Sequence, residues 1–277
     1  MIKIENFKEF GFDTAVRGVR LSYKSGDKSD SFTDDFGTFH MGQKDHDLIL
    51  SLSKKSDSEA TPLRQIIISF DVTAPIMWWK QMDRYSVGKT QMSESTMHTL
   101  MNCPVTIEDF ATDGIREKIT VNASDKYYQI KYDETIKNIT NTINSLINIY
   151  KELKNNVSSD PLKAEKLKEI ERMVELLLPE SYLQKRTITM NYTVFRHIYY
   201  DRYYKPHKML EWQQFCEQML DKLSYVEFID EKVKLAEERN ELLSKLGNLN
   251  IEKIHLERAV KKINEKLNEE AKDNGNH

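Results

Sequence analysis

Apolar side chains recur at steps of three and four residues in the middle of the chain, which is the spacing of one helix face. The clearest case spans residues 135–155, where the repeat is Ile136, Ile139, Ile143, Leu146 and Tyr150. We therefore predict an amphipathic helix there. The pattern predicts further helices at residues 76–84, 93–101, 187–203 and 211–223, and one that ends at Leu178–Pro179.

β-branched residues mark the clearest strand, at residues 66–74, and Pro75 ends it because proline cannot donate to a sheet ladder. Residues 1–24 alternate loosely and predict a short strand region. Residues 117–133 predict a short strand followed by the start of a helix, and residues 45–54 fit a helix or a strand.

The end of the chain follows a different repeat, with apolar residues every seven positions. The first row is Leu235, Leu242, Leu249, Leu256 and Ile263, and the second row holds Leu246, Val260 and Leu267. This heptad pattern, interrupted at Arg239 and Lys253, predicts a coiled coil that pairs with a second copy of the chain. A long helix packed on its own domain is the alternative. We therefore divide the chain into a domain of residues 1–225 and a helical tail of residues 226–277.

Charge and composition exclude several protein classes. Charged residues make up 31% of the chain, but 41 basic and 44 acidic residues leave a net charge of −3, so no global field attracts a nucleic acid polymer. The two cysteines, Cys103 and Cys216, lie far apart, which argues against a disulfide framework or a metal site. Neither a membrane span nor the apolar stretch of a signal peptide is present, so a cytoplasmic protein is expected.

Polar and aromatic side chains gather in residues 74–100, directly after the predicted strand. They include Trp78, Trp79, Gln81, Arg84, Tyr85, Glu94, Ser95, Thr96 and His98. This group suits a flat aromatic ligand that carries phosphate, because hydroxyls and backbone N–H groups at a helix start bind anions. An ordinary strand-to-helix connection with satisfied polar groups explains the same residues equally well.

A second group lies in residues 191–212, where Asn191, His197 and Arg202 follow one another at intervals of six and five. Arg202 can pair bidentately with a uracil edge or a phosphate, since its guanidinium presents a planar fork. The alternative is an aromatic packing ridge in which this arginine makes a structural ion pair, with the tyrosines Tyr199, Tyr200, Tyr203 and Tyr204.

Several signatures of common enzyme classes are missing from the sequence. It contains no GxGxxG, Walker, HExxH or GxSxG segment, and no serine or cysteine beside a base in a recognisable motif. Catalysis by a covalent protein nucleophile is therefore not expected.

Both groups of residues resemble those of the flavin-dependent thymidylate synthases, in a divergent branch common in phages and anaerobic bacteria. The first matching block holds Ala74, Pro75, Trp78, Trp79, Asp83, Tyr85, Val87, Gly88, Ser93, Ser95, Thr96, Met97 and His98. The second block holds Asn191, Arg202, His207, Glu211 and Trp212. The resemblance covers residues 45–220. Typical members carry Arg-His-Arg where this chain has Arg84, Tyr85 and Ser86.

Carried over position by position, the resemblance implies two neighbouring binding sites. The flavin site would contain Arg84, Tyr85, Ser86, Glu94, Asn191, His197 and His207. The dUMP site would contain Gln81, Ser95, Thr96, His98 and Arg202. Arg202 would be the catalytic residue, and Arg172 is held more loosely as a further phosphate ligand.

The resemblance also implies an α+β fold, with a central mixed sheet flanked by long helices, and a homotetramer with active sites at subunit interfaces. The implied reaction converts dUMP to dTMP with methylenetetrahydrofolate as carbon donor and NADPH as the reductant of FAD. Arg202 would hold the uracil and favour charge on its carbonyl oxygens. Two alternatives stay open: a dUMP hydroxymethylase on the same scaffold, and a non-catalytic nucleotide-binding or assembly protein that works through its coiled coil.

Overall fold

The computed structural model describes residues 2–112, 123–156, 161–205 and 207–233, together with 235, 242, 245 and 246. Contacts group the chain into two units, Met1–Ile229 and Asp230–His277. Most of the predicted coiled coil lies outside the described residues, so it stays a prediction. None of the helices in the described ranges is long and apolar enough to cross a membrane.

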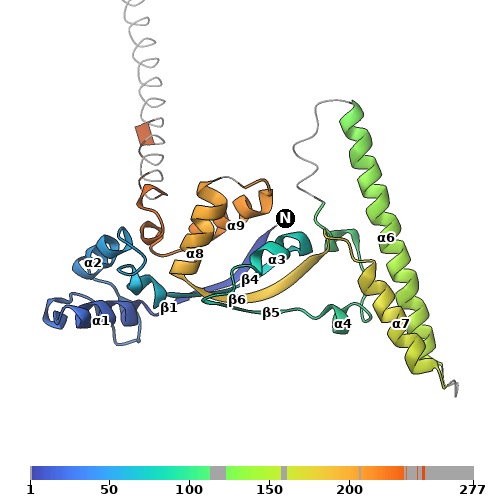
Figure 1. Cartoon of the computed structure of the whole chain (residues 1–277), viewed down its shortest axis with the longest axis horizontal. Coiled ribbons are helices and arrows are strands. Elements are labelled where there is room, and N and C mark those ends of the chain that lie inside the picture. The colour runs from blue at the N-terminus through green and yellow to red at the C-terminus, as the bar shows by residue number, and fades with distance from the viewer. Residues whose placement is uncertain are drawn as a thin grey trace, which may run out of the picture. The chain divides into compact units, whose positions relative to one another are not determined.

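A four-stranded antiparallel sheet forms the centre of the first unit, in the order β1-β4-β6-β5 (Figure 1). The strands are β1 (Lys3–Phe10), β4 (Ile67–Pro75), β5 (Lys89–Ser93) and β6 (Leu183–Asn191). The predicted α+β class is confirmed. The sheet differs from the predicted mixed sheet, because every pairing among the described strands is antiparallel.

The two faces of this sheet have different chemistry because side chains alternate along each strand. Ile68, Phe70 and Val72 of β4 point into the core and are fully buried. On the opposite face, Asp71 accepts a hydrogen bond from Thr187 at 2.7 Å. The alternation of apolar and polar residues in β4 thus decides which face receives the helices.

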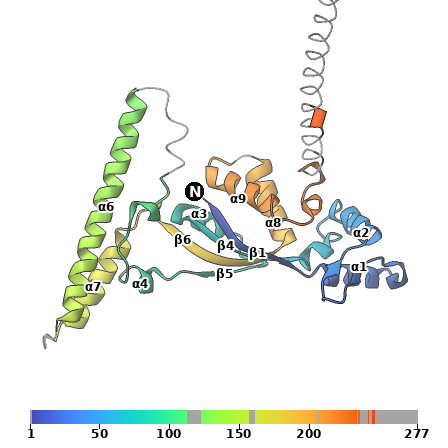
Figure 2. The ribbon, with the colours of Figure 1, turned by 180° about the vertical axis from the view of Figure 1, so that it is seen from behind.

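Three helices cover the apolar face, as Figures 1 and 2 show from opposite sides. They are α3 (Ile76–Met82), α8 (Tyr192–Tyr199) and α9 (Leu210–Leu220). Aromatic rings fill the space between them: Trp78 lies 4.9 Å from Trp212 and 5.1 Å from Phe215, centroid to centroid. Both tryptophans are completely buried. The predicted strand at residues 66–74 and helix at residues 76–84 are therefore confirmed.

A pair of long helices packs at one end of the sheet, with the short helix α4 (Thr96–Thr99) beside it (Figure 1). The pair consists of α6 (Ala123–Asn155) and α7 (Lys163–Leu176). Ile136, Ile143 and Ile147 of α6 are buried against Val174 of α7 in one hydrophobic cluster. This confirms the amphipathic helix predicted for residues 135–155, because the residues at the predicted spacing form its buried face.

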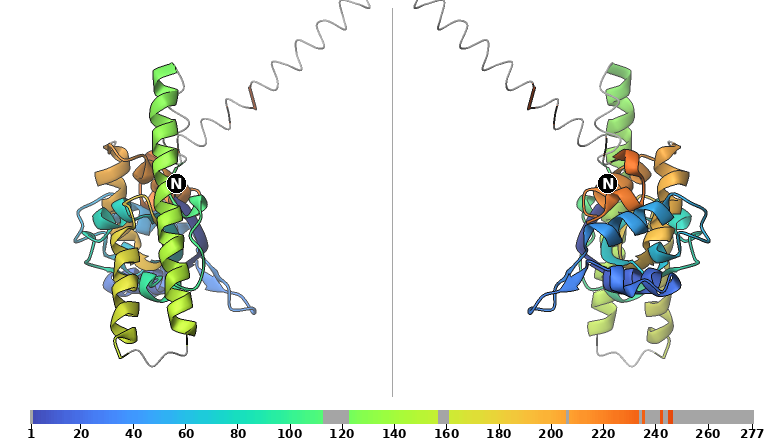
Figure 3. Two further views of the ribbon diagram at one scale, coloured as in Figure 1. Left: turned by 90° about the vertical axis from the view of Figure 1, so that its right-hand side faces the viewer. Right: turned by 90° about the vertical axis from the view of Figure 1, so that its left-hand side faces the viewer.

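The opposite end carries α1 (Phe12–Ser22), α2 (Gln43–Ser53) and the short helix η2 (Thr61–Arg64). A two-stranded hairpin connects α1 and α2, and Figure 3 shows it extending away from them. Its strands are β2 (Phe32–Thr33) and β3 (Phe39–His40), preceded by the short helix η1 (Gly26–Lys28). The helical alternative for residues 45–54 is the one adopted.

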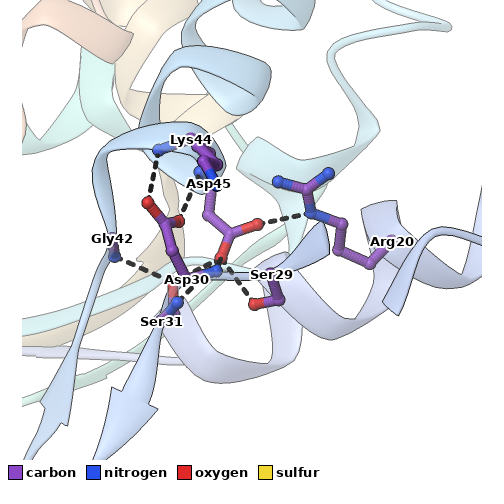
Figure 4. A network of polar contacts seen from close by, with 7 residues as sticks. All are labelled: Arg20, Ser29, Asp30, Ser31, Gly42, Lys44 and Asp45. Carbon is purple, nitrogen blue, oxygen red and sulfur yellow. Dashed lines mark hydrogen bonds and ion pairs between the residues drawn. The ribbon is translucent and has the colours of Figure 1, made fainter. Parts of the chain in front are cut away.

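One buried carboxylate fastens this hairpin segment to both helices (Figure 4). Asp45 is fully buried, and its Oδ1 accepts a hydrogen bond from Nε of Arg20 at 2.5 Å. Its Oδ2 accepts bonds from the hydroxyls of Ser29 and Ser31, each at 2.6 Å. Burial raises the pKa of Asp45, but the bonds from Ser29, Ser31 and Arg20 outweigh it and hold the pKa at about 2. We call these residues the Asp45 network.

Three predicted elements differ from the structure. Residues 187–191, predicted as helix, belong to strand β6, and α8 begins only after Asn191. The helix predicted at residues 93–101 is preceded by strand β5 and shrinks to the four residues of α4. Residues 1–24 contain strand β1, but also the whole of α1, which the loose alternation did not predict. In the first two cases the strand pairing depends on distant residues, which a local pattern does not contain.

Candidate functional site

Four of the predicted site residues meet where α3, α8 and α9 end or begin: Gln81, Tyr85, Arg202 and His207. Arg202 lies in a π-helical turn, Tyr200–Tyr204, which continues α8. Turns of this kind are uncommon and occur frequently at functional sites, because they shift side chains away from regular helical positions. We call these four residues, with Trp212, the Arg202 cluster.

The guanidinium of Arg202 is held by two aromatic side chains. Its Nε donates a hydrogen bond to the hydroxyl of Tyr85 at 2.9 Å. Its carbon lies 5.7 Å from the ring centroid of Tyr85 and 5.1 Å from that of Trp212, within the range of cation–π attraction. Nη1 and Nη2 have no hydrogen-bond partner among the residues that the structure describes. They form a planar fork available to a ligand.

Gln81, near the end of α3, connects this helix to Trp212 of α9 at the base of the cluster. Its side-chain oxygen accepts a hydrogen bond from Nε1 of the buried Trp212 at 3.0 Å, and its amide nitrogen donates to the sulfur of Met209. Helix α3 fixes Gln81 because Pro75 ends β4, and the N–H groups of Ile76 and Met77 then donate to carbonyls just before β6. The floor of the cluster is thereby tied to the sheet.

His207 adds a second titratable group. Burial, together with the positive charges of Arg202 and Lys208, lowers its pKa below the ordinary value, so the ring is neutral at neutral pH. Nδ1 accepts a hydrogen bond from the backbone N–H of Met209 at 3.2 Å, which leaves the proton on Nε2. His207 therefore offers a neutral N–H donor rather than a second charge.

Tyr85 is also neutral under ordinary conditions. Burial raises the pKa of its phenol, and the charge of Arg202 opposes that rise without cancelling it. The phenol oxygen can therefore accept from Arg202 without neutralising its charge. The cluster combines a cationic fork with apolar aromatic walls, a combination that suits a planar ligand with carbonyl or anionic oxygens along its edge.

Four further predicted residues lie in a second region, between β5 and α4: Glu94 of the predicted flavin site, and Ser95, Thr96 and His98 of the predicted dUMP site. Glu94 is exposed, its N–H donates to the Lys185 carbonyl at 2.9 Å, and its own carbonyl accepts from Gln184 at 3.0 Å. Ser95 occupies the cap position of α4 with an extended backbone, and Thr96 begins the helix. The side chain of His98 is not among those described. No contact within the described part of the chain brings these residues to Arg202.

Asn191 caps α8, because its side-chain oxygen accepts a hydrogen bond from the N–H of Val194 at 3.0 Å. Gly88 packs closely beside it with a positive φ of 74°. A Cβ at Gly88 would lie 2.9 Å from the Val194 side chain, so this turn requires glycine. The turn of residues 83–88, which carries Arg84 and Ser86, is thereby held against the start of α8.

The remaining predicted residues lie at the surface. Arg84 and Ser86 are exposed in the turn before β5, and Arg172 is exposed on α7. His197 is half exposed, and its Nε2 lies 3.2 Å from a carboxylate oxygen of Asp57. This polar contact ties α8 to the loop after α2, which gives His197 a structural partner in the single chain.

Two residues beside the cluster are given no role by the sequence analysis, Arg186 and Trp212. Arg186 of β6 lies 4.4 Å from the ring centroid of Trp79, and its Nη1 pairs with Asp83 at 2.9 Å. Trp212, which forms one wall of the Arg202 cluster, was matched by the resemblance but received no role. Predicting residues 187–191 as helix concealed the fact that Arg186 lies on the same sheet face as α3.

Cavities do not by themselves identify the site. A cavity of about 740 Å³ lies between α1 and residues 58–65, and none of the predicted site residues lines it. A smaller one, of about 390 Å³, is lined by Glu94, Thr99 and Tyr182 beside α4. Within the described ranges, no group of three His, Cys, Asp or Glu side chains could hold a metal ion. The candidate site is therefore identified from the chemistry of the Arg202 cluster rather than from cavity size.

Comparisons with known proteins agree with the predicted family. The family model of the thymidylate synthase complementing proteins matches residues 10–226. No curated protein gives a significant match. The solved structure of thymidylate synthase X from Helicobacter pylori, with FAD and dUMP, is similar with a TM-score of 0.54. The two chains are 13% identical, and the match covers 83% of this chain and 98% of that chain.

A second similar structure is the UMP/dUMP methylase PolB from Streptomyces cacaoi, bound with 5-Br dUMP. Its TM-score is 0.51 at 18% identity, and the match covers 82% of this chain and 93% of that chain. At such identities the likeness to both structures establishes a common fold.

Proposed function

The chain belongs to the family of thymidylate synthase complementing proteins, the flavin-dependent thymidylate synthases, and on that premise we propose that it methylates dUMP to dTMP with FAD. The observation that carries the proposal is the free fork of Arg202, held by Tyr85 and Trp212. A uracil ring has the flat shape and the carbonyl edge that such a fork binds. Methylenetetrahydrofolate is the proposed carbon donor, and NADPH the proposed reductant.

Arg202 contributes orientation and charge to this reaction. Its two terminal nitrogens donate to oxygens of the uracil, and its positive charge stabilises the negative charge that develops on them in the transition state. The neutral N–H of His207 is a further donor beside the same surface, and Gln81 of the proposed dUMP site holds the indole of Trp212 in place. Bound FAD supplies the hydride chemistry, while the protein supplies binding, orientation and electrostatics.

Two of the proposed flavin residues offer hydrogen-bond donors on one side of the turn of residues 83–88. Arg84 is an exposed cation, suited to a phosphate, and it lies in the same turn as Gly88. The amide nitrogen of Asn191 faces this turn and has no hydrogen-bond partner among the described residues. Both groups can donate to a dinucleotide lying across the turn of residues 83–88. Tyr85, Ser86, Glu94, His197 and His207 complete the proposed flavin site.

The separation of Arg202 from Ser95 and Thr96 supports a site shared between subunits. In a single chain the two regions have no contact in the described residues, although the proposed dUMP site needs both. We infer that the chain forms a homotetramer, in which the β5–α4 turn of one subunit completes the Arg202 cluster of another. His98, whose side chain is not described, belongs to the same turn.

The test is the flavin spectrum of the purified full-length protein. Adding dUMP to the protein with FAD is expected to change the flavin absorbance in a saturable way, because the two ligands lie side by side. UMP, added at the same concentrations, tests whether the protein distinguishes ribose from deoxyribose. An absorbance that stays unchanged at every dUMP concentration would favour the non-catalytic alternative.

Product analysis separates the two enzymatic alternatives. With labelled methylenetetrahydrofolate and NADPH, the proposal predicts labelled dTMP. Labelled hydroxymethyl-dUMP instead would identify the hydroxymethylase on the same scaffold.

A further inference from the structure

We propose that Tyr85 is a positioning residue for Arg202, which restricts the guanidinium to binding the nucleotide through its outer edge. The inference rests on the proposed function and assigns to Tyr85 a role beyond contact with the flavin. It follows from the way in which one tyrosine and one tryptophan surround the arginine.

A guanidinium can bind an edge with two acceptors in two ways. It uses either Nε with one terminal nitrogen, or both terminal nitrogens together. In this structure Nε is already occupied, since it donates to the Tyr85 hydroxyl at 2.9 Å. Only the outer edge, formed by Nη1 and Nη2, is left for a bidentate ligand. The hydroxyl of Tyr85 thus determines which edge of the Arg202 guanidinium binds the substrate.

The phenol has a second polar neighbour. Its oxygen lies 3.4 Å from a carboxylate oxygen of Asp201, a long contact toward which it can donate while it accepts from Arg202. Its ring also lies 6.0 Å from that of Trp212, at an angle of 72°. Asp201 precedes Arg202 in the same π-helical turn, so the turn, the phenol and the guanidinium form one unit. The bond from Nε to Tyr85 and the contacts with the two rings together restrict rotation of the guanidinium.

A neutral acceptor suits this role better than a carboxylate would. A carboxylate beside Nε would orient the arginine but would also cancel the charge on which binding of the uracil edge depends. The phenol is neutral at neutral pH, and burial raises its pKa further. Tyr85 therefore orients Arg202 and leaves its charge for the substrate.

The substitution Tyr85→Phe tests this role, since it keeps both ring contacts and removes only the hydroxyl. The measured quantity is the affinity for dUMP of the full-length, FAD-loaded protein, determined by titration calorimetry. Four proteins are compared: the wild type, Tyr85→Phe, Arg202→Lys and the double variant. We expect Tyr85→Phe to weaken binding about tenfold in the wild type but less than about twofold beside Arg202→Lys, as for two residues that act as a unit.

The controls separate orientation from stability. Tyr23→Phe removes the hydroxyl of an exposed tyrosine outside the cluster and should leave the affinity unchanged. Circular dichroism fixes a temperature at which all the variants are folded, and every titration is made there. A role in folding alone would change the melting temperature and would weaken binding by the same factor in both backgrounds.

Two results would overturn the inference while leaving the proposed function intact. One is an unchanged dUMP affinity in Tyr85→Phe, and the other is an equal loss with and without Arg202→Lys. A wild-type protein that fails to bind dUMP at all would overturn the proposed function, and this inference with it.

Discussion

Arg20 and Arg202 are both held by other side chains of the protein, but their surroundings differ in burial and in charge. Arg20 is buried and faces the fully buried carboxylate of Asp45 at 2.5 Å, so the pair is neutral as a whole. Arg202 instead faces a phenol and an indole, both uncharged, and its outer nitrogens have no partner within the described residues. The charge of Arg20 is compensated within the protein, whereas no carboxylate is paired with Arg202 in the described residues.

The comparison shows how two arginines in one chain serve different purposes. A guanidinium paired with a carboxylate, which is in turn bonded by Ser29 and Ser31, holds three segments of the N-terminal region together. A guanidinium among neutral aromatic groups contributes little to stability but keeps its affinity for an anionic or carbonyl edge. Burial and the charge of the partner therefore both separate the structural Arg20 from Arg202, for which we propose a binding role.

The largest effect on stability is expected from Arg20→Ala. This substitution leaves the carboxylate of Asp45 buried without its cationic partner, which costs about 3–5 kcal/mol of unfolding free energy. Arg17→Ala, an exposed position on the same helix, is the matched control and should change stability by about 0.5 kcal/mol or less. Urea unfolding measures both variants. Equal stabilities of the two would show that the Asp45 network does not hold this region together.

Arg202→Lys is expected to affect turnover instead. Lysine keeps the charge but loses the planar fork, so the loss is about 2–4 kcal/mol of transition-state stabilisation, or roughly 30- to 1000-fold in rate. The melting temperature should stay close to that of the wild type, because the substitution removes one hydrogen bond, from Nε to Tyr85, of a side chain that is only partly buried. Arg17→Lys serves as the control. Near-normal turnover by Arg202→Lys would place this arginine outside the site.

The Asp45 network should make the stability of the protein depend on pH. The pKa of the Asp45 carboxyl is about 2 in the folded protein, against an ordinary value of 3.8. The ionised carboxylate therefore contributes its full stabilisation above about pH 4, and this contribution is lost as the pH falls toward 2. The full contribution is about 2.5 kcal/mol, of which about 1 kcal/mol should be lost by pH 3. Asp45→Asn should lack this part of the pH dependence. Parallel pH profiles for the two proteins would contradict the assignment.

Removing the tail is expected to have the smallest effect on the unit that contains both arginines. Truncation after Asp230 keeps the whole first unit, which extends to Ile229. The unfolding free energy of that unit should change by about 0.5 kcal/mol or less. The assembly should change, because the heptad pattern of residues 235–267 favours a partner chain. Light scattering compares the masses of the two proteins. Identical masses with equal activity would contradict the prediction that the tail pairs with a second copy of the chain.

Part of the fold could be predicted because some patterns are local. The β-branched run of β4 and the three-and-four spacing of α6 are complete within their own segments. Strand β6 was missed because only Ile188 and Met190 mark its buried face near its end, while the aromatic residues that follow have helical spacing. Strand β5 is short and polar, and its pairing with β6 joins segments about a hundred residues apart.

The site was predictable only in part for a related reason. The resemblance selected Gln81, Tyr85, Arg202 and His207, and the structure brings these four together. It gave no indication that Tyr85 bonds to Arg202, because the two residues are 117 positions apart and meet only in the folded chain. The assignment of each residue to flavin or nucleotide stays a prediction.

A crystal structure of the full-length protein with FAD and dUMP tests the central claim most directly. The account predicts that Nη1 and Nη2 of Arg202 lie about 2.9 Å from oxygens of the uracil, while Nε keeps its bond to Tyr85. It also predicts that Ser95 and Thr96 near the same nucleotide come from a neighbouring subunit. A nucleotide bound without contact to Arg202 would contradict the account.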